Sequence, residues 1–412
     1  MQTEIQTILK NIRPNKEEQA KFKQSSDSFL KKIKIKDTQI ILGGSGAKDT
    51  WLSGSHDIDV YVVFNYRRYA QKSGELSRIL EKELKKIFPK VAKLHGSRDY
   101  FRLNYQDYLF EIIPILEISK AKEAANLTDI SPLHSVWVNK HTKKLKDEIR
   151  LAKQFCKANN LYGAESYLAG FSGYVLEILV AHYGSFEKLL QASQLWKIKE
   201  VIDPEKHYQK KMALLQLNQS KLQSPLIVID PVDKSRNAAA ALGLEKFNLF
   251  RKLAKSYLQQ PSADFFIKKE VTFPELKKEA ERKKLNLVYL EIQPLSGKRD
   301  VVGSKLLKAF QFLEQQLSAF EVKKSGWDWN RYYFILGKRE LPKFMVRNGP
   351  PLKLKQFVKD FQKKNKDNFV KDGRLYAKIK VQNPKLENYL NQLLENGYVQ
   401  EKMRKIVKIN II

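Results

Sequence analysis

The stretch from Gly43 to Phe64, GGSGAKDTWLSGSHDIDVYVVF, constrains the fold of this chain more than any other. It opens with glycines around Ser45, directly after a strand predicted at 38–42, and closes with an alternating run that predicts a second strand at 57–64. Glycines let backbone N–H groups and a hydroxyl approach phosphate oxygens closely, because no side chain intervenes. A glycine-rich turn is by itself more often only a turn.

Two acids begin the second of these strands. Asp57 and Asp59 are two residues apart, so the period of a strand places both carboxylates on one face, while Ile58 and Val60 point to a core. Neighbouring carboxylates repel each other unless a cation lies between them. Mg²⁺ takes oxygen ligands of this kind. The alternative is a solvent-exposed pair, which is common for the Asp-x-Asp pattern.

A third acid, Glu111, lies inside the apolar run YLFEIIPIL at 108–116. This run and 100–105 read as two strands joined by a tight turn at Gln106-Asp107. A buried charge is costly unless it is paired or binds a metal. If 108–116 ran antiparallel beside 57–64, Glu111 would face both aspartates; the alternative is an edge-strand Glu in solvent. Three carboxylates and a glycine-serine turn suit two-metal nucleotidyl transfer, with the ions ~3.5–4 Å apart.

The rest of the chain divides by its periodicity. The first 120 residues or so read as a mixed α/β unit, residues from about 140 as mainly helical, and residues after a boundary at 259–262 as strands and basic helices. Predicted elements outside the motif are helices at 15–35, 74–88, 145–156, 171–182 and 305–320, a strand and loop at 225–241, and strands at 287–292 and 331–336.

The charge of the chain favours a polyanionic partner. Lys and Arg number 76 against 45 Asp and Glu, and the part from Pro261 onward holds 33 basic and 17 acidic residues. The lone cysteine, Cys156, excludes a disulfide within the chain and falls on an apolar helix face, where we expect it to be inert. The N-terminus is polar and the apolar runs are short, so we expect a cytoplasmic protein without a membrane partner.

The Gly43–Phe64 stretch resembles the nucleotidyltransferase signature G-S-x-x-[KR]-G-T-W-L-x-G…D-x-D. Further blocks at 133–155, 162–186 and 229–242 resemble the archaeal (class I) CCA-adding enzymes, the tRNA nucleotidyltransferases, and 345–352 and 373–380 do so more loosely. The blocks YGAESYLAGFSGYVLEILVAHYGSF and IDPVDKSRNAAAAL separate this family from poly(A) polymerases and small antibiotic nucleotidyltransferases, which share only the first signature.

The resemblance implies the following roles. Asp57, Asp59 and Glu111 correspond to the catalytic carboxylates that hold two Mg²⁺ ions. The positions that correspond to the nucleotide site are Ser45 and Lys48 for the triphosphate, His134, Lys153 and Tyr162 for the nucleotide, and Arg236 near the incoming base and the RNA end.

From the residues alone, the nucleotide-site positions also have ordinary explanations. Lys153 reads as one more solvated lysine, His134 as a structural histidine, Tyr162 as a packed aromatic and Arg236 as the partner of Asp233.

The sequence departs from the family pattern at two positions. Glu111 stands where the family usually has Asp, which moves the ligand by about one C–C bond and keeps an oxygen donor. Asp49 stands where the signature has Gly, beside the proposed phosphate turn. We expect the Asp49 side chain to point away from the turn toward a lysine.

The sequence therefore predicts an α+β multidomain protein. It consists of a polymerase-β-like nucleotidyltransferase palm with a mixed sheet (1–140), a helical central domain that completes the nucleotide pocket (141–258) and a basic α/β tRNA-binding region (259–412). The predicted activity is template-independent addition of CCA to the 3′ end of tRNA from CTP and ATP, with contacts to the acceptor end and stem. The alternatives are a poly(A) polymerase or partial CC- or A-adding enzyme, and an RNA-binding protein with an inactive transferase fold. The sequence does not determine the oligomeric state.

Overall fold

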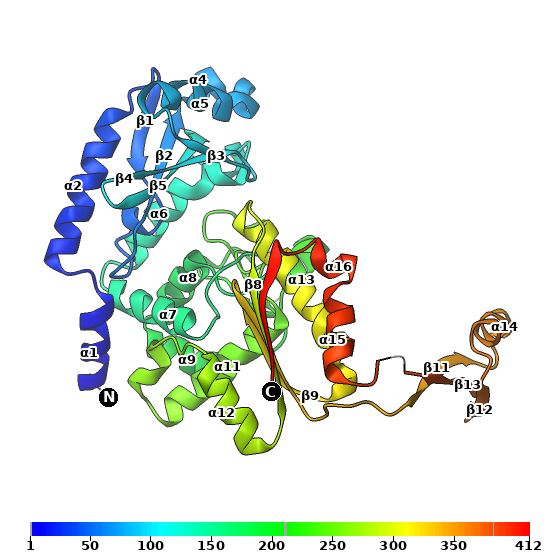
Figure 1. Ribbon diagram of the computed structural model, residues 1–412. Coiled ribbons are helices and arrows are strands. Elements are labelled where there is room, and N and C mark those ends of the chain that lie inside the picture. Colours follow the sequence, from blue (N-terminus) through cyan, green and yellow to red (C-terminus); the bar gives the residue numbers. More distant parts are fainter. Residues whose placement is uncertain (1, 210–211, 382) are drawn as a thin grey trace. The chain divides into compact units, whose positions relative to one another are not determined.

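The computed structural model of the chain describes residues 2–209, 212–381 and 383–412 (Figure 1). The chain divides into two compact units, Met1–Lys269 and Glu270–Ile412. This division comes later than the predicted boundary at 259–262, because Phe266 still packs into the first unit beside Phe155 and Tyr257.

A five-stranded sheet in the order β1-β2-β5-β4-β3 forms the first part of unit one. β2 lies antiparallel to β1 and parallel to β5, and β4 forms an antiparallel hairpin with β5. The hairpin turn is at Gln106 and Asp107, whose positive φ angles of 46° and 66° are those of a tight two-residue turn. The bounds are β1 (Thr38–Leu42), β2 (Asp57–Phe64), β3 (Ala92–Leu94), β4 (Tyr100–Tyr105) and β5 (Tyr108–Leu116).

Two amphipathic helices, α2 (Lys16–Lys32) and α5 (Leu76–Ile87), cover one face of this sheet (Figure 1). Phe22 and Phe29 of α2 pack against Ile58 and Val60 of β2, as the alternating pattern predicts. The acids of β2 therefore lie on the opposite face. The short elements around the sheet are α3 (Gly44–Ala47), α4 (Tyr66–Tyr69), a 3₁₀ helix at Ala70–Glu75, and two more at Ala121–Glu123 and Leu127–Ile130.

The rest of unit one is mainly helical. The core contains Phe155 of α7, Leu176 of α8 and Phe250 of α11, and α1 packs against α7. The bounds are α1 (Gln2–Ile12), α6 (Ser131–His141), α7 (Lys146–Ala158), α8 (Gly173–Tyr183), α9 (Phe186–Ser193), β6 (Glu200–Ile202), α10 (Ala213–Gln216), a 3₁₀ helix at Gln219–Leu222, β7 (Leu226–Val228), α11 (Leu244–Gln259) and a 3₁₀ helix at Ala263–Phe266.

Unit two contains an antiparallel sheet in the order β14-β8-β10-β9. Phe310 of α13 and Leu390 of α15 pack on one face, and Leu276 of α12 packs on the other. The bounds are α12 (Phe273–Lys283), β8 (Asn286–Gln293), α13 (Arg299–Leu317), a 3₁₀ helix at Ser318–Phe320, β9 (Val322–Asp328), β10 (Arg331–Leu336), α15 (Leu386–Leu394), α16 (Gly397–Gln400) and β14 (Lys405–Ile411).

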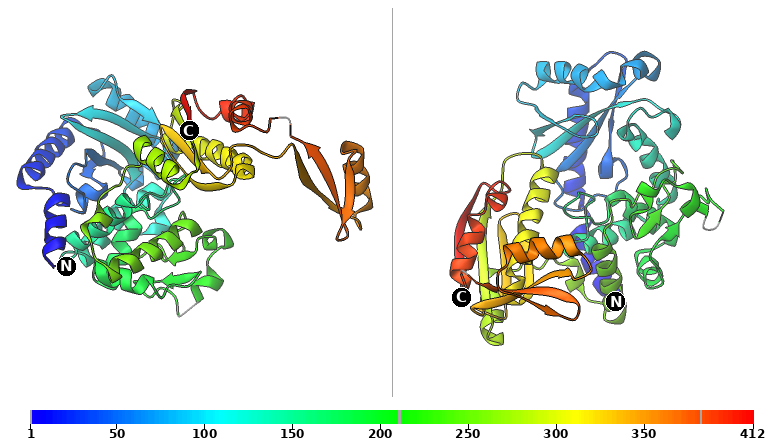
Figure 2. Two further views of the ribbon diagram at one scale, coloured as in Figure 1. Left: turned by 60° about the horizontal axis from the view of Figure 1, so that its bottom comes forward. Right: turned by 90° about the vertical axis from the view of Figure 1, so that its right-hand side faces the viewer.

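A small second sheet, in the order β11-β13-β12, lies between β10 and α15 in the sequence. α14 packs on it (Figure 2). A Cβ built on Gly349 of β11 would stand 2.9 Å from the Phe361 ring of this helix. Within the described residues, every helix is too short or too polar to traverse a bilayer. The bounds are β11 (Phe344–Pro351), α14 (Lys355–Lys364), β12 (Asn368–Lys371) and β13 (Arg374–Lys380).

Candidate active site

Asp59 and Glu111 occupy adjacent strands at the same level of the sheet. The parallel register of β2 and β5 pairs Asp59 with Glu111, and Asp57 begins β2 two residues earlier. The prediction that these strands run antiparallel was wrong. The helix α5 and the strands β3 and β4 follow β2, so the chain crosses over before it enters β5 and the two strands run parallel. Residues in register on neighbouring strands share a face, so the predicted proximity of the acids is retained.

The negative charges of this face act on one another. Burial, and next the charge of Glu111, raise the pKa of Asp59 to about 6; Lys48 lowers it and Asp57 raises it further. Asp57 is exposed at the start of its strand. The Glu111 carboxylate accepts hydrogen bonds from the Arg102 guanidinium on β4, one of them 3.1 Å from Nε.

This donor set fits a hard divalent cation. It consists of carboxylate oxygens only, and a cation would offset both the burial and the repulsion by Glu111 that raise the pKa of Asp59. With Glu111 turned onto Arg102, the described residues hold no ready-made group of three or more acidic, His or Cys side chains for a metal. Both Arg102 bonds reach Oε1 of Glu111, so the other carboxylate oxygen could bind an ion without loss of this pair.

The glycine turn lies directly against Asp59. The N–H of Gly43 donates to the carbonyl of Asp59 at 2.8 Å, and Gly44 has a φ of +54°. A Cβ built on Gly44 would stand 1.7 Å from Oδ2 of Asp59. The residue must therefore be glycine for the carboxylate to lie here. Ser45 follows in the one-turn helix α3.

Helices α6 and α7 hold the end of this turn. Arg150 of α7 donates from Nε to the carbonyl of Trp51 at 3.0 Å and from Nη2 to the carbonyl of Asp49 at 2.9 Å. Lys146 donates to the carbonyl of Lys48 at 2.7 Å. The predicted nucleotide turn of the sheet domain is therefore fixed by the helical domain.

The Asp49 side chain pairs with an arginine, so the prediction that it contacts a lysine was wrong. Its Oδ1 accepts from Nη2 of Arg150 at 2.7 Å, and the side chain is 65% exposed. Its φ is +49°, a left-handed conformation that glycine adopts without strain. The glycine of the family signature fits this backbone conformation.

Two lysines of the predicted nucleotide site meet at one buried acid that was not among the predicted residues. Lys48 and Lys153 donate to Oε2 and Oε1 of Glu177 at 2.6 and 2.8 Å, and Thr50 donates to Oε1 at 2.6 Å. Burial alone would raise the pKa of Glu177, but Lys153 and Lys48 outweigh it and lower the value to about 2. Lys153 is 3% exposed, so the solvated-lysine interpretation was wrong.

A second buried acid, Asp230, gathers His134, Arg236 and Tyr174. His134 Nε2 lies 3.0 Å from Oδ2 of Asp230, Arg236 Nη1 donates to the same oxygen at 2.5 Å, and the Tyr174 hydroxyl donates to Oδ1 at 3.1 Å. The His134 ring stacks on Tyr174 with centroids 4.1 Å apart. Arg236 pairs with Asp230 and not with Asp233, so that alternative was wrong.

Tyr162 lies close to Lys153. Burial raises the pKa of its hydroxyl, and its ring lies 5.2 Å from Nζ of Lys157, a residue absent from the predicted set. A Cβ on Gly173 would stand 2.7 Å from the Tyr162 hydroxyl and 3.5 Å from Cε of Lys153. Tyr162 therefore packs beside Lys153 at the start of α8.

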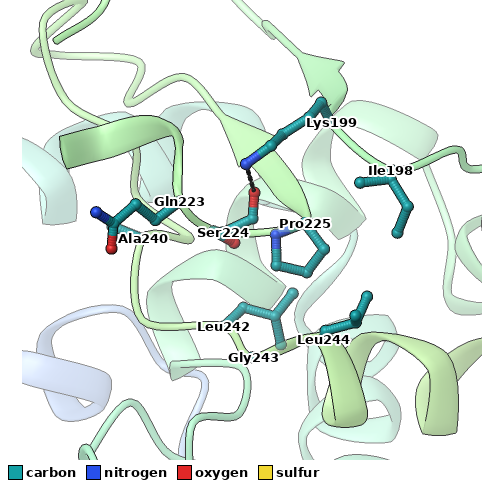
Figure 3. Close-up of a pocket in the computed structure, with 9 residues that line it drawn as sticks. All are labelled: Ile198, Lys199, Gln223, Ser224, Pro225, Ala240, Leu242, Gly243 and Leu244. Atoms are coloured by element: carbon teal, nitrogen blue, oxygen red, sulfur yellow. Dashed lines mark hydrogen bonds between the residues drawn. The ribbon is translucent and has the colours of Figure 1, made fainter. Parts of the chain in front are cut away.

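A surface hollow elsewhere in unit one does not carry this chemistry (Figure 3). Its one charged lining residue, Lys199, donates to the backbone carbonyl of Ser224 at 3.1 Å. The remaining lining residues are Ile198, Gln223, Pro225, Ala240, Leu242, Gly243 and Leu244. The hollow contains none of the predicted site residues.

Carboxylates on adjacent strands facing a glycine-serine turn, with Lys48 at the end of the turn and Lys153 supplied by the helical domain, are the arrangement of a nucleotidyltransferase. Residues 23–121 match the nucleotidyltransferase domain, and residues 147–267 match the second domain of tRNA nucleotidyltransferases. The structure of the Cid1 poly(U) polymerase with MgGTP bound is similar to this one, with a TM-score of 0.51 and 14% sequence identity. The alignment covers 64% of this chain and 98% of the Cid1 chain, which shows a shared fold.

The curated relatives that match over nearly the full length include two CCA-adding enzymes at 30% identity or more. The CCA-adding enzyme of Nanoarchaeum equitans is 36% identical over 89% of this chain and 90% of its own. The CCA-adding enzyme of Thermococcus kodakarensis is 30% identical over 99% of this chain and 93% of its own. The chain belongs to the family of CCA-adding enzymes, the tRNA nucleotidyltransferases. The predicted family, fold class and enzyme class are thus confirmed.

Proposed function

We propose that this enzyme rebuilds the 3′ CCA end of tRNA, adding C twice from CTP and then A from ATP without a nucleic-acid template. The observation that carries the proposal is the pairing of Asp59 with Glu111 across β2 and β5, opposite the glycine turn of a chain from the CCA-adding family. Cytoplasmic location is part of the same proposal.

The sheet acids, the glycine turn and Lys48 have different roles at the nucleotide. Asp57, Asp59 and Glu111 would hold two Mg²⁺ ions, which supply activation of the tRNA 3′-hydroxyl and stabilisation of the pyrophosphate. Ser45 and the N–H groups of the turn bind the triphosphate oxygens. Lys48 adds a positive charge at the same place, where it also lowers the pKa of Asp59.

His134, Tyr162 and Arg236 orient the nucleoside and the RNA end. The Arg236 side chain is 25% exposed, and its pair with Asp230 fixes the plane of its remaining donors. A base edge that matches these donors is accepted, and one that leaves buried polar groups unpaired is rejected. The pocket, together with the growing RNA end, therefore selects C or A.

The basic C-terminal region binds tRNA through phosphates and shape, as it must accept every tRNA. The small sheet and α14, residues 343–380, hold twelve basic and three acidic residues. Exposed Phe344, Phe357 and Phe369 lie among them. The division of unit one near residue 140 into palm and helical domains belongs to the same proposal.

The test is end-extension of a tRNA that stops at the discriminator base. CTP alone should add two residues, ATP alone none, and both together CCA, with release of pyrophosphate that EDTA abolishes. A run of A would indicate a poly(A) polymerase, and addition of only CC or only A a partial enzyme. Binding without pyrophosphate release would indicate an inactive transferase fold and overturn the proposal.

A further inference from the structure

Glu177 is a completely buried acid between two parts of the site. It lies on α8, and its carboxylate binds Lys48 and Thr50 from the turn side and Lys153 from α7. Its side chain is 0% exposed, and its three partners reach it at 2.6–2.8 Å. Charge-assisted bonds of this length are strong in a buried environment. Glu177 therefore joins the nucleotide turn to the helical domain.

The two lysines that share Glu177 are not equivalent. Nζ of Lys153 donates to Glu177 at 2.8 Å, to Oγ1 of Thr50 at 2.8 Å and to the carbonyl of Thr50 at 3.1 Å. An ammonium has three N–H donors, so all three are used within the protein. Nζ of Lys48 makes one hydrogen bond within the described residues, to Glu177, which leaves two donors for a ligand.

The Lys48 ammonium lies near other residues of the proposed nucleotide site. Its charge lowers the pKa of Asp59, and its Nζ lies 5.7 Å from the centroid of the Tyr174 ring, which stacks on His134. A lysine has a flexible four-carbon stem that costs entropy to hold in one position. The bond to Glu177 fixes this stem before a nucleotide arrives.

We propose that Glu177 is a positioning residue that holds Lys48 ready for the triphosphate of CTP and ATP, with Lys153 bound to the other oxygen of the same carboxylate. This rests on the proposed nucleotide site. The two lysines and one carboxylate leave a net positive charge, which suits a polyanionic triphosphate. Since both nucleotides carry the same triphosphate, the effect on both should be equal.

Another buried ion pair of unit one provides a matched control. Asp129 is 0% exposed, pairs with Arg98, and accepts from the backbone N–H groups of Leu116 and Asn126 at 2.9 Å. Like Glu177→Gln, Asp129→Asn neutralises one side of a buried pair. Unlike Glu177, Asp129 contacts neither the nucleotide turn nor Lys153.

The experiment measures kcat and KM for CTP on tRNA lacking CCA and for ATP on tRNA lacking the terminal A, with the full chain. Glu177→Gln should raise both KM values by the same factor, about 10- to 100-fold, because a charged hydrogen bond to Lys48 is lost. tRNA affinity should not change. Asp129→Asn should lower the melting temperature with KM values near those of the parent.

A double-mutant cycle tests whether Glu177 acts through Lys48. Adding Lys48→Met to Glu177→Gln should raise KM little further, whereas independent effects would multiply. Glu177→Asp keeps the charge and should fall between parent and Glu177→Gln; it also replaces that variant if Glu177→Gln does not fold. Unchanged KM values, an equal rise in Asp129→Asn, or multiplying effects overturn the inference, while an inactive parent enzyme overturns the proposed function instead.

Discussion

Replacement of Gly44 by Ala is the sharpest test of the site geometry. The new Cβ would stand 1.7 Å from Oδ2 and 2.6 Å from Cγ of Asp59. Non-bonded heavy atoms lie about 3.5 Å apart at their optimum, so the carboxylate or the turn must move by about 1–2 Å. Misplacement of a catalytic group by about 1 Å can cost about 10²-fold in rate.

Gly54 isolates the backbone contribution to this effect. Gly44 and Gly54 both have left-handed φ angles, +54° and +72°, so alanine at either position costs about 1–2 kcal/mol of backbone strain. A Cβ on Gly54 meets nothing within 4 Å among the described residues. Gly54→Ala therefore carries the strain of Gly44→Ala without its collision.

The assay is kcat/KM for CTP incorporation, with thermal unfolding measured on the same samples. We expect Gly44→Ala to lose at least about 100-fold in kcat/KM and Gly54→Ala to remain close to the parent. Both melting temperatures should fall by a few degrees, about 2–4 °C per kcal/mol for a unit of this size. Equal activities of the two variants would refute the argument that the Asp59 carboxylate must lie against the turn.

Three further results are expected. In the metal-free protein, the raised pKa of Asp59 means that the folded state binds this proton more tightly than the unfolded state, so stability falls as pH rises from about 4 to about 6. Asp59→Asn should thus melt higher than the parent at pH 8 in EDTA and much less so at pH 4, without activity; a constant difference would contradict the shift. Asp49→Gly should leave the nucleotide KM nearly unchanged, since the exposed carboxylate is already paired with Arg150 and the backbone bonds to Arg150 remain; a clear fall in KM would show that Asp49 weakens binding. tRNA affinity should fall steeply with salt, whereas a flat dependence would mean that the excess of basic residues is not an RNA surface.

Local patterns in the sequence predicted the sheet domain well. The bounds of β2 and the hairpin of β4 and β5 agree with the structure, because alternation and a two-residue polar turn are local properties. The direction of β5 relative to β2 was wrong. The short strand β3 (Ala92–Leu94) was not among the predicted elements. It adds one more reversal of the chain between the helix at 74–88 and the hairpin, and this reversal makes β5 parallel to β2.

Local sequence patterns did not identify the hydrogen-bond partners of the site residues. Arg236 was expected to pair with Asp233 three residues away, but the acid it binds, Asp230, also receives His134 from 96 residues earlier in the chain. Asp49 likewise pairs with Arg150, 101 residues away. The pair of Asp49 with Arg150 depends on how α7 docks on the sheet domain, and that of His134 with Asp230 on how α6 packs against the loop after β7, neither of which side-chain spacing encodes.

The burial of Glu177 could have been predicted from the sequence. It is the single acid in the apolar run Val175–Val180, all of it buried, and an unpaired charge there would be prohibitively costly. The same reasoning singled out Glu111 in its strand, and applied to α8 it would have required cationic partners for Glu177. It would not have named them, because Lys48 lies 129 residues away and Lys153 lies 24. A lone acid in a buried apolar helix near a proposed triphosphate site therefore predicts lysines that are held in place, and the structure is needed only to say which of them keeps donors free.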